Sequence, residues 1–358
     1  MAKKKILLLS DDLRMSSGVG TVSKNFVLGT IHKYDWVQAG GAIKHPEEGK
    51  IVDMNESVRK DTGIKDASLK IYPISGYGSQ ELVRNLINIE KPDAIMHYTD
   101  PRFWVWLYQM EHEIRQNIPI FYYNIWDDLP YPRYNENFYE SSDLIMNISK
   151  QTVNIVEQVC QNKPRTDWDC TYIPHGIPEK TFFPIDKDNK ELKSFRKKVL
   201  HNKDKDFIIF WNNRNIRRKL PSDVIMAYKT FCDNLPKEKA EKCLLLMHTA
   251  PKDNNGTDLP EVVRNICPDY EVIFSHQRLD DKHMNFLYNI ADIQVNIASN
   301  EGFGLGTAEA VMAGTPMIVN VTGGLQDQCG FELNGKHVGY EDYREIVSFH
   351  DRDKWEHN

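Results

Sequence analysis

Two carboxylates, Glu301 and Glu309, stand eight positions apart on the two sides of a glycine-rich turn. The apolar run 293–298 before the turn predicts a buried parallel strand, and residues 307–313 behind it predict a helix. Three glycines lie between the two glutamates and permit a tight backbone approach to a ligand. We therefore expect Glu301 in the loop and Glu309 in the helix, with both carboxylates accepting hydrogen bonds from hydroxyl groups.

The start of that predicted helix also suits an anion. Free backbone N–H groups at a helix start favour negative charge, so a diphosphate can lie against Phe303, Gly304 and Leu305. Sugars and riboses supply the hydroxyl groups that the two carboxylates would bind. The segment is therefore typical of a nucleotide-sugar site.

A basic loop provides a second candidate element. Arg214 and Lys219 lie five positions apart, after an apolar strand and before the predicted helix 222–232, so both cations can converge at the carboxyl end of a strand. A guanidinium binds two phosphate oxygens at once and an ammonium acts as a point charge, which stabilises a diphosphate leaving group. Arg217 and Arg218 lie between the two and could serve in place of Arg214.

The pattern of Glu301, seven residues and Glu309 resembles the signature of retaining glycosyltransferases of family four, which have the GT-B fold. The resemblance implies that Glu301 and the backbone amides after it hold the donor sugar, while Glu309 binds the nucleotide ribose. The family also has an Arg and a Lys at the spacing of Arg214 and Lys219. Their implied role is to stabilise charge on the leaving diphosphate.

The resemblance implies an α/β protein with two Rossmann-like domains facing a central cleft. We expect residues 1–185 to bind the acceptor and residues 186–358 to bind the donor, with the boundary in the polar stretch 183–205. The segment 172–178 resembles the family's passage into its second domain. The chain departs from the family at 330–358, which is short, charged and without a long amphipathic helix, as in a truncated or reduced second domain.

The amino-terminal half begins with the apolar strand 4–10, followed by an expected loop at 16–23 and a helical stretch to about Leu28. Gly18 and Gly20 lie in that loop. The third glycine of a dinucleotide-binding fingerprint is absent, so the pattern does not favour an oxidoreductase. In the resembling family a glycine-rich loop here approaches the donor phosphate or the acceptor, which implies a binding role for both glycines.

Further strands alternate with helical stretches, as expected of a parallel sheet. We expect strands at 94–98, 119–125 and 144–149. After the second of these the family often has a His followed by Asp near the anomeric centre, and here Trp126 stands in place of the His while Asp127 is kept. Asp127 is thus expected to contact the donor sugar or the acceptor. His97 either compensates for the missing imidazole or is a hydrogen-bonding wall residue, and His175 is expected to be structural.

Composition narrows the class of protein. The net charge of −6 over 358 residues argues against tight, nonspecific nucleic-acid binding, and no apolar run reaches the roughly 20 residues of a membrane span. A strand follows Met1–Lys5 directly, so we expect a cytoplasmic protein. The six cysteines lack metal-binding spacing and are read as reduced thiols. Acid-x-acid triplets such as Asp186 and Asp188 lie in charged, linker-like segments, so no metal ion or cofactor is expected.

These observations lead to one functional hypothesis. The protein is expected to be a retaining hexosyl- or pentosyltransferase that moves a sugar from a UDP- or GDP-linked donor to an acceptor hydroxyl. The acceptor stays open among a glycan, a lipid-linked sugar, a protein and a modified nucleic-acid base. The alternatives are a noncatalytic nucleotide-sugar-binding protein, an epimerase and a glycan phosphorylase.

Overall fold

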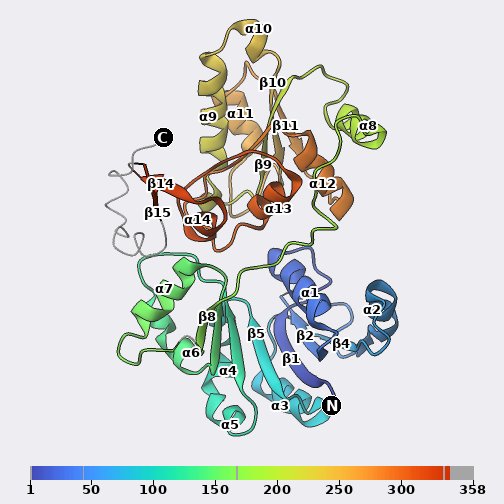
Figure 1. The fold of residues 1–358 in the computed structure, drawn as a ribbon, viewed down its shortest axis with the longest axis vertical. Helices are drawn as coiled ribbons and strands as arrows, with labels where there is room; N and C mark the ends of the chain where they lie inside the picture. Colours follow the sequence, from blue (N-terminus) through green and yellow to red (C-terminus); the bar gives the residue numbers. More distant parts are fainter. Residues whose placement is uncertain (1, 43, 167, 334, 339–358) are drawn as a thin grey trace. The chain divides into compact units, whose positions relative to one another are not determined.

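The structure, a computed structural model, describes residues 2–42, 44–166, 168–333 and 335–338. The chain divides into two compact units. The first contains the described residues of Met1–Gly176 together with 332–338, and the second is Ile177–Phe331. Each unit is an α/β domain built on its own sheet (Figure 1).

An eight-stranded sheet forms the centre of the first unit, in the order β3-β4-β2-β1-β5-β6-β7-β8. Only β3 runs antiparallel to its neighbour. The strands are β1 (Lys4–Asp11), β2 (Tyr34–Gly41), β3 (Val52–Asp53), β4 (Leu69–Pro73), β5 (Ala94–Tyr98), β6 (Ile120–Asn124), β7 (Leu144–Asn147) and β8 (Cys170–Tyr172). Figure 1 shows β4, β2, β1 and β5 side by side.

Helices connect these strands. They are α1 (Gly18–Thr30), α2 (Asn55–Thr62), α3 (Gln80–Glu90), α4 (Val105–Gln109), α5 (Glu111–Arg115), α6 (Glu136–Glu140) and α7 (Lys150–Val159), with 3₁₀ turns η1 (Pro101–Trp104) and η2 (Arg133–Asn135). Three of the longer helices begin after a serine whose hydroxyl accepts a backbone N–H of the first turn, namely Ser17, Ser79 and Ser149. Such a cap stabilises a helix by about 1 kcal/mol and sets where it begins.

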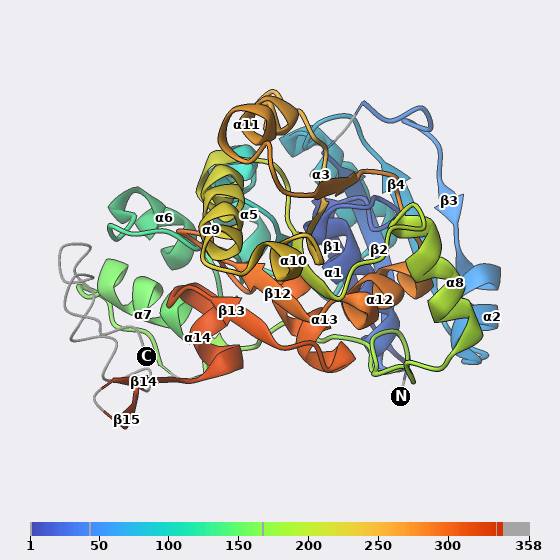
Figure 2. The same ribbon diagram turned by 90° about the horizontal axis from the view of Figure 1, so that it is seen from above.

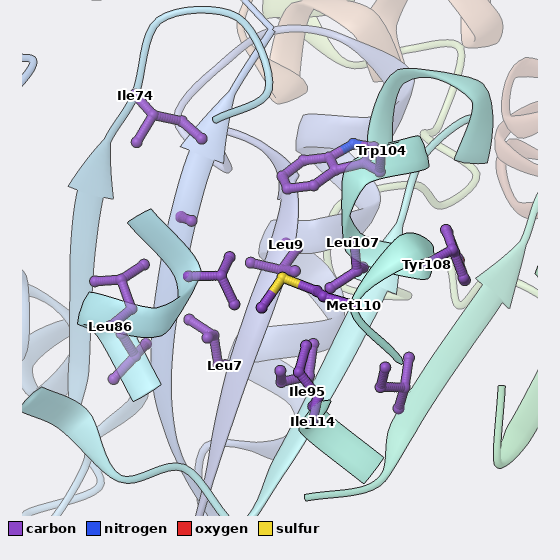
Figure 3. Packing of buried hydrophobic residues seen from close by; sticks show 14 residues of the cluster. Leu7, Leu9, Ile74, Leu86, Ile95, Trp104, Leu107, Tyr108, Met110 and Ile114 are labelled. Carbon is purple, nitrogen blue, oxygen red and sulfur yellow. The ribbon is translucent and has the colours of Figure 1, made fainter. Parts of the chain in front are cut away.

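The core of this unit explains why its central strands are almost entirely apolar. Residues 6–11 of β1 are buried throughout, as expected of a parallel strand with both faces covered. Figure 3 shows Leu9 of β1 packed among Leu107 and Met110, with Trp104 above them and Ile95 of β5 below. Helices α3, α4 and α5 supply this layer of side chains.

The second unit has a five-stranded parallel sheet in the order β11-β10-β9-β12-β13. Its strands are β9 (Phe207–Asn212), β10 (Cys243–His248), β11 (Val272–Ser275), β12 (Ile293–Asn296) and β13 (Met317–Val319). Its helices are α8 (Lys190–Val199), α9 (Pro221–Asp233), α10 (Lys237–Ala240), α11 (Leu259–Ile266), α12 (Asp281–Ile290), α13 (Leu305–Ala313) and α14 (Gly323–Cys329), with the 3₁₀ turn η3 (Arg217–Lys219).

Both faces of this second sheet are covered by helices. Along β9, Ile208 and Phe210 pack into one apolar cluster with residues of α12 and α13, while Ile209 and Trp211 pack into another with residues of α9 and α11. This alternation follows the two-residue period of a strand. Figure 2 shows α9 and α11 side by side. Two α/β units, each built on a sheet of mostly parallel strands, confirm the expected α/β fold class.

Some expected boundaries differ from the structure. The loop expected at 16–23 is wrong, because helix α1 begins at Gly18 and takes both glycines into its first turns. Residues 177–185, expected in the first domain, lie with the second unit, where Phe182 is part of the core. Most of the stretch 330–358 lies outside the described residues, which end with the two-stranded sheet β14 (Phe331–Leu333) and β15 (Lys336–Val338). No described helix combines the length and apolarity needed to cross a membrane.

Candidate functional site

The turn between β12 and α13 is built around Gly304. This residue has a φ of 88°, in the left-handed region that glycine tolerates, and its carbonyl oxygen accepts the N–H groups of Thr307 and Ala308 at 3.1 and 3.0 Å. A Cβ there would stand 2.7 Å from Leu325 and 3.2 Å from Glu301. Helix α13 begins at Leu305, two residues earlier than expected, and its first N–H groups have no acceptor within the helix.

Glu301 lies in the loop before this helix, as predicted, and is buried. Its carbonyl oxygen accepts the N–H of Gly324 at 3.1 Å. Gly323 has a φ of 46° and lies so close that a Cβ would stand 1.7 Å from that same oxygen. Thus the start of α14 packs directly on the backbone of Glu301. This contact holds the Cα of Glu301, and with it the base of the Glu301 side chain, in place.

The basic loop after β9 meets the Glu301 loop. The ammonium of Lys219 forms a buried ion pair with Oε2 of Glu301. Arg218 joins the same two loops, since its carbonyl oxygen accepts the N–H of Ser299 at 2.8 Å and its guanidinium donates to the carbonyl of Asn300 at 2.6 Å. The sequence predicted that Lys219 and Glu301 belong to one site, and they are in contact although 82 residues separate them.

Arg214 has a different partner. Its guanidinium donates to the carboxylate of Asp253 at 2.9 and 3.3 Å, and 63% of its side chain is exposed. The neighbouring Asn215 is fully buried, where its amide donates to the carbonyl of Thr257 at 2.6 Å and anchors the loop that carries Asp253. Of the predicted cations, Lys219 is therefore the one paired with Glu301, while Arg214 extends along the 251–257 loop. Its role at the diphosphate stays a prediction.

Glu309 lies inside α13, as predicted, and is mostly buried. The hydroxyl of Tyr288 donates to its Oε2 at 2.6 Å, and the amide of Asn212 donates to that hydroxyl at 2.8 Å. Burial raises the pKa of Glu309 to about 7, against the opposing effect of the Tyr288 hydrogen bond. Neither Tyr288 nor Asn212 was selected from the sequence, because nothing in their spacing links them to Glu309.

In the first unit the predicted glycines, Gly18 and Gly20, lie in the first turn of helix α1. The hydroxyl of Ser17 accepts the N–H of Gly20 at 3.0 Å and donates to Oδ2 of Asp11 at 3.1 Å. A Cβ at Gly20 would stand 2.6 Å from the carbonyl oxygen of Met15. Gly18 is the first residue of α1. The close approach explains why a glycine occupies position 20, and a binding role for the two glycines stays a prediction.

Asp11 is a candidate that the sequence reasoning missed. It ends β1 and is buried, and among the described residues its Oδ1 has no hydrogen-bond partner. Burial raises the pKa of this carboxyl above its usual range. The sequence held a signal for this residue, because Asp11 stands at the carboxyl end of a mostly apolar strand, the edge where parallel α/β sheets bind ligands.

The loop after β6 carries the remaining candidate, Asp127, which is partly exposed. Its neighbour Trp126 is fixed by hydrogen bonds at both nitrogens, from its backbone N–H to Oδ1 of Asn124 at 3.1 Å and from its indole to the carbonyl of Asp128 at 2.9 Å. The guanidinium of Arg102 lies 5.1 Å from its ring. Trp126 thus shapes this loop, and the contact of Asp127 with a sugar stays a prediction.

His97 does not compensate for the missing imidazole, which corrects one of the two interpretations. It is fully buried, with Nδ1 2.7 Å from the hydroxyl of Tyr108 and its ring stacked on Tyr122 at 5.2 Å. Burial lowers its pKa to about 3, so the imidazole is neutral at physiological pH. His175 lies 2.8 Å from the hydroxyl of Tyr123, and burial lowers its pKa to about 3 as well, in accord with a structural role.

Within the ranges that the structure covers, no group of three or more His, Cys, Asp or Glu side chains could hold a metal ion. All six cysteines are free thiols, as expected. Metal independence of any reaction stays a prediction.

Two α/β units with a strand, glycine turn and helix at the candidate site define the class of the protein by its fold. Solved structures with this fold include a trehalose-6-phosphate protein from E. coli bound with UDP-2-fluoro glucose (TM-score 0.65, 13% identity, covering 90% of this chain and 86% of that one). Another is a sucrose-phosphate synthase from Thermosynechococcus elongatus (TM-score 0.65, 15% identity, 96% and 89%). The chain therefore has the GT-B fold of glycosyltransferases, with two Rossmann-like domains.

A third similar structure is an alpha,alpha-trehalose-phosphate synthase (UDP-forming) from Burkholderia xenovorans in complex with glucose-6-phosphate (TM-score 0.65, 11% identity, covering 99% of this chain and 94% of that one). At these identities the likeness concerns the fold alone. Residues 192–348 match the family model described as glycosyl transferases group 1. No curated protein sequence matches the chain.

Proposed function

We propose that this protein is a retaining glycosyltransferase that moves a sugar from a nucleotide-diphosphate sugar to an acceptor hydroxyl. The observation that carries the proposal is the cluster at the start of α13, where Glu301, Lys219 and the first N–H groups of the helix lie at one turn. The glycosyl transferases group 1 match over 192–348 and the similarity to a protein bound with UDP-2-fluoro glucose support it.

In this proposal each donor group has a partner in the second unit. The diphosphate lies against the backbone at Phe303, Gly304 and Leu305, where the N–H groups and helix dipole favour negative charge. Glu301 accepts hydrogen bonds from the sugar hydroxyls, and Glu309 accepts them from the ribose. The donor is UDP- or GDP-linked, and its sugar is a hexose or a pentose.

Lys219 and Arg214 then act on the leaving group. When the bond between the anomeric carbon and the diphosphate oxygen breaks, negative charge grows on the phosphate, and an ammonium and a guanidinium in a water-poor site stabilise it. Lys219 is the buried cation, and an ammonium divides its three N–H donors among several acceptors. Glu301 thereby holds the ammonium in place while both groups bind the donor.

Retention follows from the groups that are proposed to act. The acceptor oxygen attacks the anomeric carbon on the face from which the phosphate leaves, the glycosidic bond breaks, and the acceptor proton passes to the leaving phosphate oxygen. The products are a nucleoside diphosphate and a glycoside of unchanged anomeric configuration. No step of this route requires a metal ion.

The acceptor is proposed to bind the first unit at the carboxyl ends of its strands. Buried Asp11 offers an unsatisfied carboxylate oxygen there, and Asp127 and the start of α1 with Gly18 and Gly20 are further candidates. A carboxylate oxygen accepts hydrogen bonds from sugar hydroxyls. A sugar phosphate joins the acceptor classes to be tried, because one similar structure is in complex with glucose-6-phosphate.

The test pairs a panel of UDP- and GDP-sugars with acceptors of each class: sugar phosphates, glycans, lipid-linked sugars, a protein and an oligonucleotide with modified bases. We expect one donor to be consumed, a product with the donor's anomeric configuration by proton magnetic resonance, and an unchanged rate with a chelator. An inverted product would overturn the mechanism. Tight donor binding in calorimetry without any transfer or hydrolysis would instead identify a noncatalytic nucleotide-sugar-binding protein.

A further inference from the structure

Three side chains from three different elements form a hydrogen-bonded relay in the second unit. The amide of Asn212, at the end of β9, donates to the hydroxyl of Tyr288 in α12 at 2.8 Å. That hydroxyl donates to Oε2 of Glu309 in α13 at 2.6 Å. A phenol has one proton, so its donation to Glu309 leaves the oxygen to accept the amide, and every bond of the relay has a defined direction.

Tyr288 is held rigidly. Its residue is fully buried, and the rings of Phe182 and Phe210 pack edge-on against it at 5.8 and 5.5 Å. Its carbonyl oxygen accepts the hydroxyl of Thr315 at 2.8 Å. A ring enclosed in this way keeps its hydroxyl in one place, so it orients the carboxylate that it contacts.

The relay engages only one side of the carboxylate. Its contact with Tyr288 is through Oε2, and among the described residues Oε1 of Glu309 has no hydrogen bond. Gly306 of α13 lies beside the relay, since a Cβ there would stand 3.4 Å, in ordinary van der Waals contact, from both the Asn212 amide and the Tyr288 hydroxyl. The bond to Oε2 thus orients the carboxylate and leaves Oε1 to accept hydrogen bonds from a ligand.

We propose that Tyr288, itself oriented by Asn212, is a positioning residue that fixes the Glu309 carboxylate so that Oε1 receives the ribose hydroxyls of the donor. The ligand in this inference, the ribose of the donor, rests on the proposed function. The hydrogen bonds of the relay are observed in the structure and do not depend on it. Charge also enters. The groups that act on Glu309 are the Tyr288 hydroxyl, which favours the carboxylate form, and the Asp281 carboxylate of α12, which opposes it. Burial already raises the pKa of Glu309, and the Tyr288 hydrogen bond opposes that rise. Removing the hydroxyl is therefore expected to raise the pKa of Glu309 further.

The first experiment needs no ligand. The infrared band of the protonated Glu309 carboxyl is obtained as the difference between the wild type and Glu309→Gln, and it is followed with pH. In Tyr288→Phe the midpoint is expected to move upward by about one pH unit, because a hydrogen bond to a charged group is lost. Asn212→Ala tests the relay without touching the ring and is expected to move the midpoint in the same direction.

The second experiment measures binding of UDP and of GDP by calorimetry across the same pH range. Tyr288→Phe is expected to weaken binding about tenfold at neutral pH and to move the inflection of affinity with pH upward, as the carboxyl does. Tyr270→Phe is the matched control, because the hydroxyl of Tyr270 also donates to a carboxylate, that of Asp233 at 2.8 Å, elsewhere in the same unit. It should change neither the midpoint nor the affinity.

The two experiments separate the two failures. If neither UDP nor GDP binds the wild type, the proposed function fails, and the infrared midpoint still decides whether Tyr288 positions Glu309. An unmoved midpoint in both Tyr288→Phe and Asn212→Ala overturns the positioning role. Equal losses of nucleotide affinity in Tyr288→Phe and Tyr270→Phe overturn it as well, since they would mark a general effect on the unit.

Discussion

Glu309→Gln is expected to make the second unit more stable at alkaline pH than the wild type. The pKa of Glu309 is raised from its ordinary 4.5 to about 7 because the carboxyl is buried. Between these two pH values the folded state binds more protons than the unfolded state. The free energy of unfolding of the wild type therefore falls as pH rises through this range. At about 1.4 kcal/mol per pH unit, the cost of the ionised carboxylate above pH 7 is on the order of 3 kcal/mol. Glutamine has no such cost, and its amide oxygen still accepts the Tyr288 hydroxyl.

The measurement must observe the second unit by itself, because a chain of two units need not unfold in one step. Hydrogen exchange of peptides from β9, β12 and α13, in increasing urea, reports the stability of that unit. The free energy of unfolding of Glu309→Gln minus that of the wild type should increase by on the order of 2 kcal/mol between about pH 5.5 and 8.5. Glu238→Gln, at an exposed position in α10, is the control, and its difference from the wild type should not change over this pH range. A difference between Glu309→Gln and wild type that stays constant with pH would refute the reasoning.

Three further predictions concern other candidate residues. Lys219→Ala and Arg214→Ala should lower kcat more than they raise KM, since leaving-group charge peaks in the transition state, and steady-state kinetics in which only KM changes would reduce both to ground-state binding groups. Gly323→Ala should unfold or displace the site, because the new Cβ would stand 1.7 Å from the carbonyl oxygen of Glu301. Gly29→Ala in α1 has open space around it, so thermal unfolding should show a free energy of unfolding higher by up to about 1 kcal/mol. Asp11→Asn should raise KM for the acceptor and leave the donor Kd unchanged; calorimetry showing a weaker donor would assign Asp11 to the wrong substrate.

The sequence predicted the parts of the site that depend on local chemistry. The apolar run into the turn became β12, and the glycine that the turn requires at positive φ is Gly304. The start of α1 was predicted too late in the chain, for a physical reason. Glycines disfavour a helix interior, but Ser17 caps the first turn and outweighs the propensity of Gly18 and Gly20. Local rules therefore conflict at that point, and the cap decides.

The contacts that span the chain could not be predicted in the same way. Tyr288 and Asn212 are 76 residues apart, and their meeting depends on how α12 packs against β9. His97 illustrates the reverse error, since a histidine at a strand end looks like a cleft residue until the sheet is covered by α4. Spacing along the chain identifies residues that share one element. Packing between elements determines which of them meet.

The structure also bears on which arginine accompanies Lys219, a choice that spacing left open. Arg218 is bound to the carbonyl of Asn300, and moving its guanidinium onto a phosphate would release the loop that carries Glu301. The guanidinium of Arg214 is paired with Asp253 and is largely exposed, and such a surface ion pair contributes little to stability and is readily exchanged. A diphosphate would therefore draw Arg214 away at little cost, while it would disturb the site by drawing Arg218. Of these two arginines, Arg214 is therefore the one expected to bind the diphosphate, while Arg218 holds the two loops together.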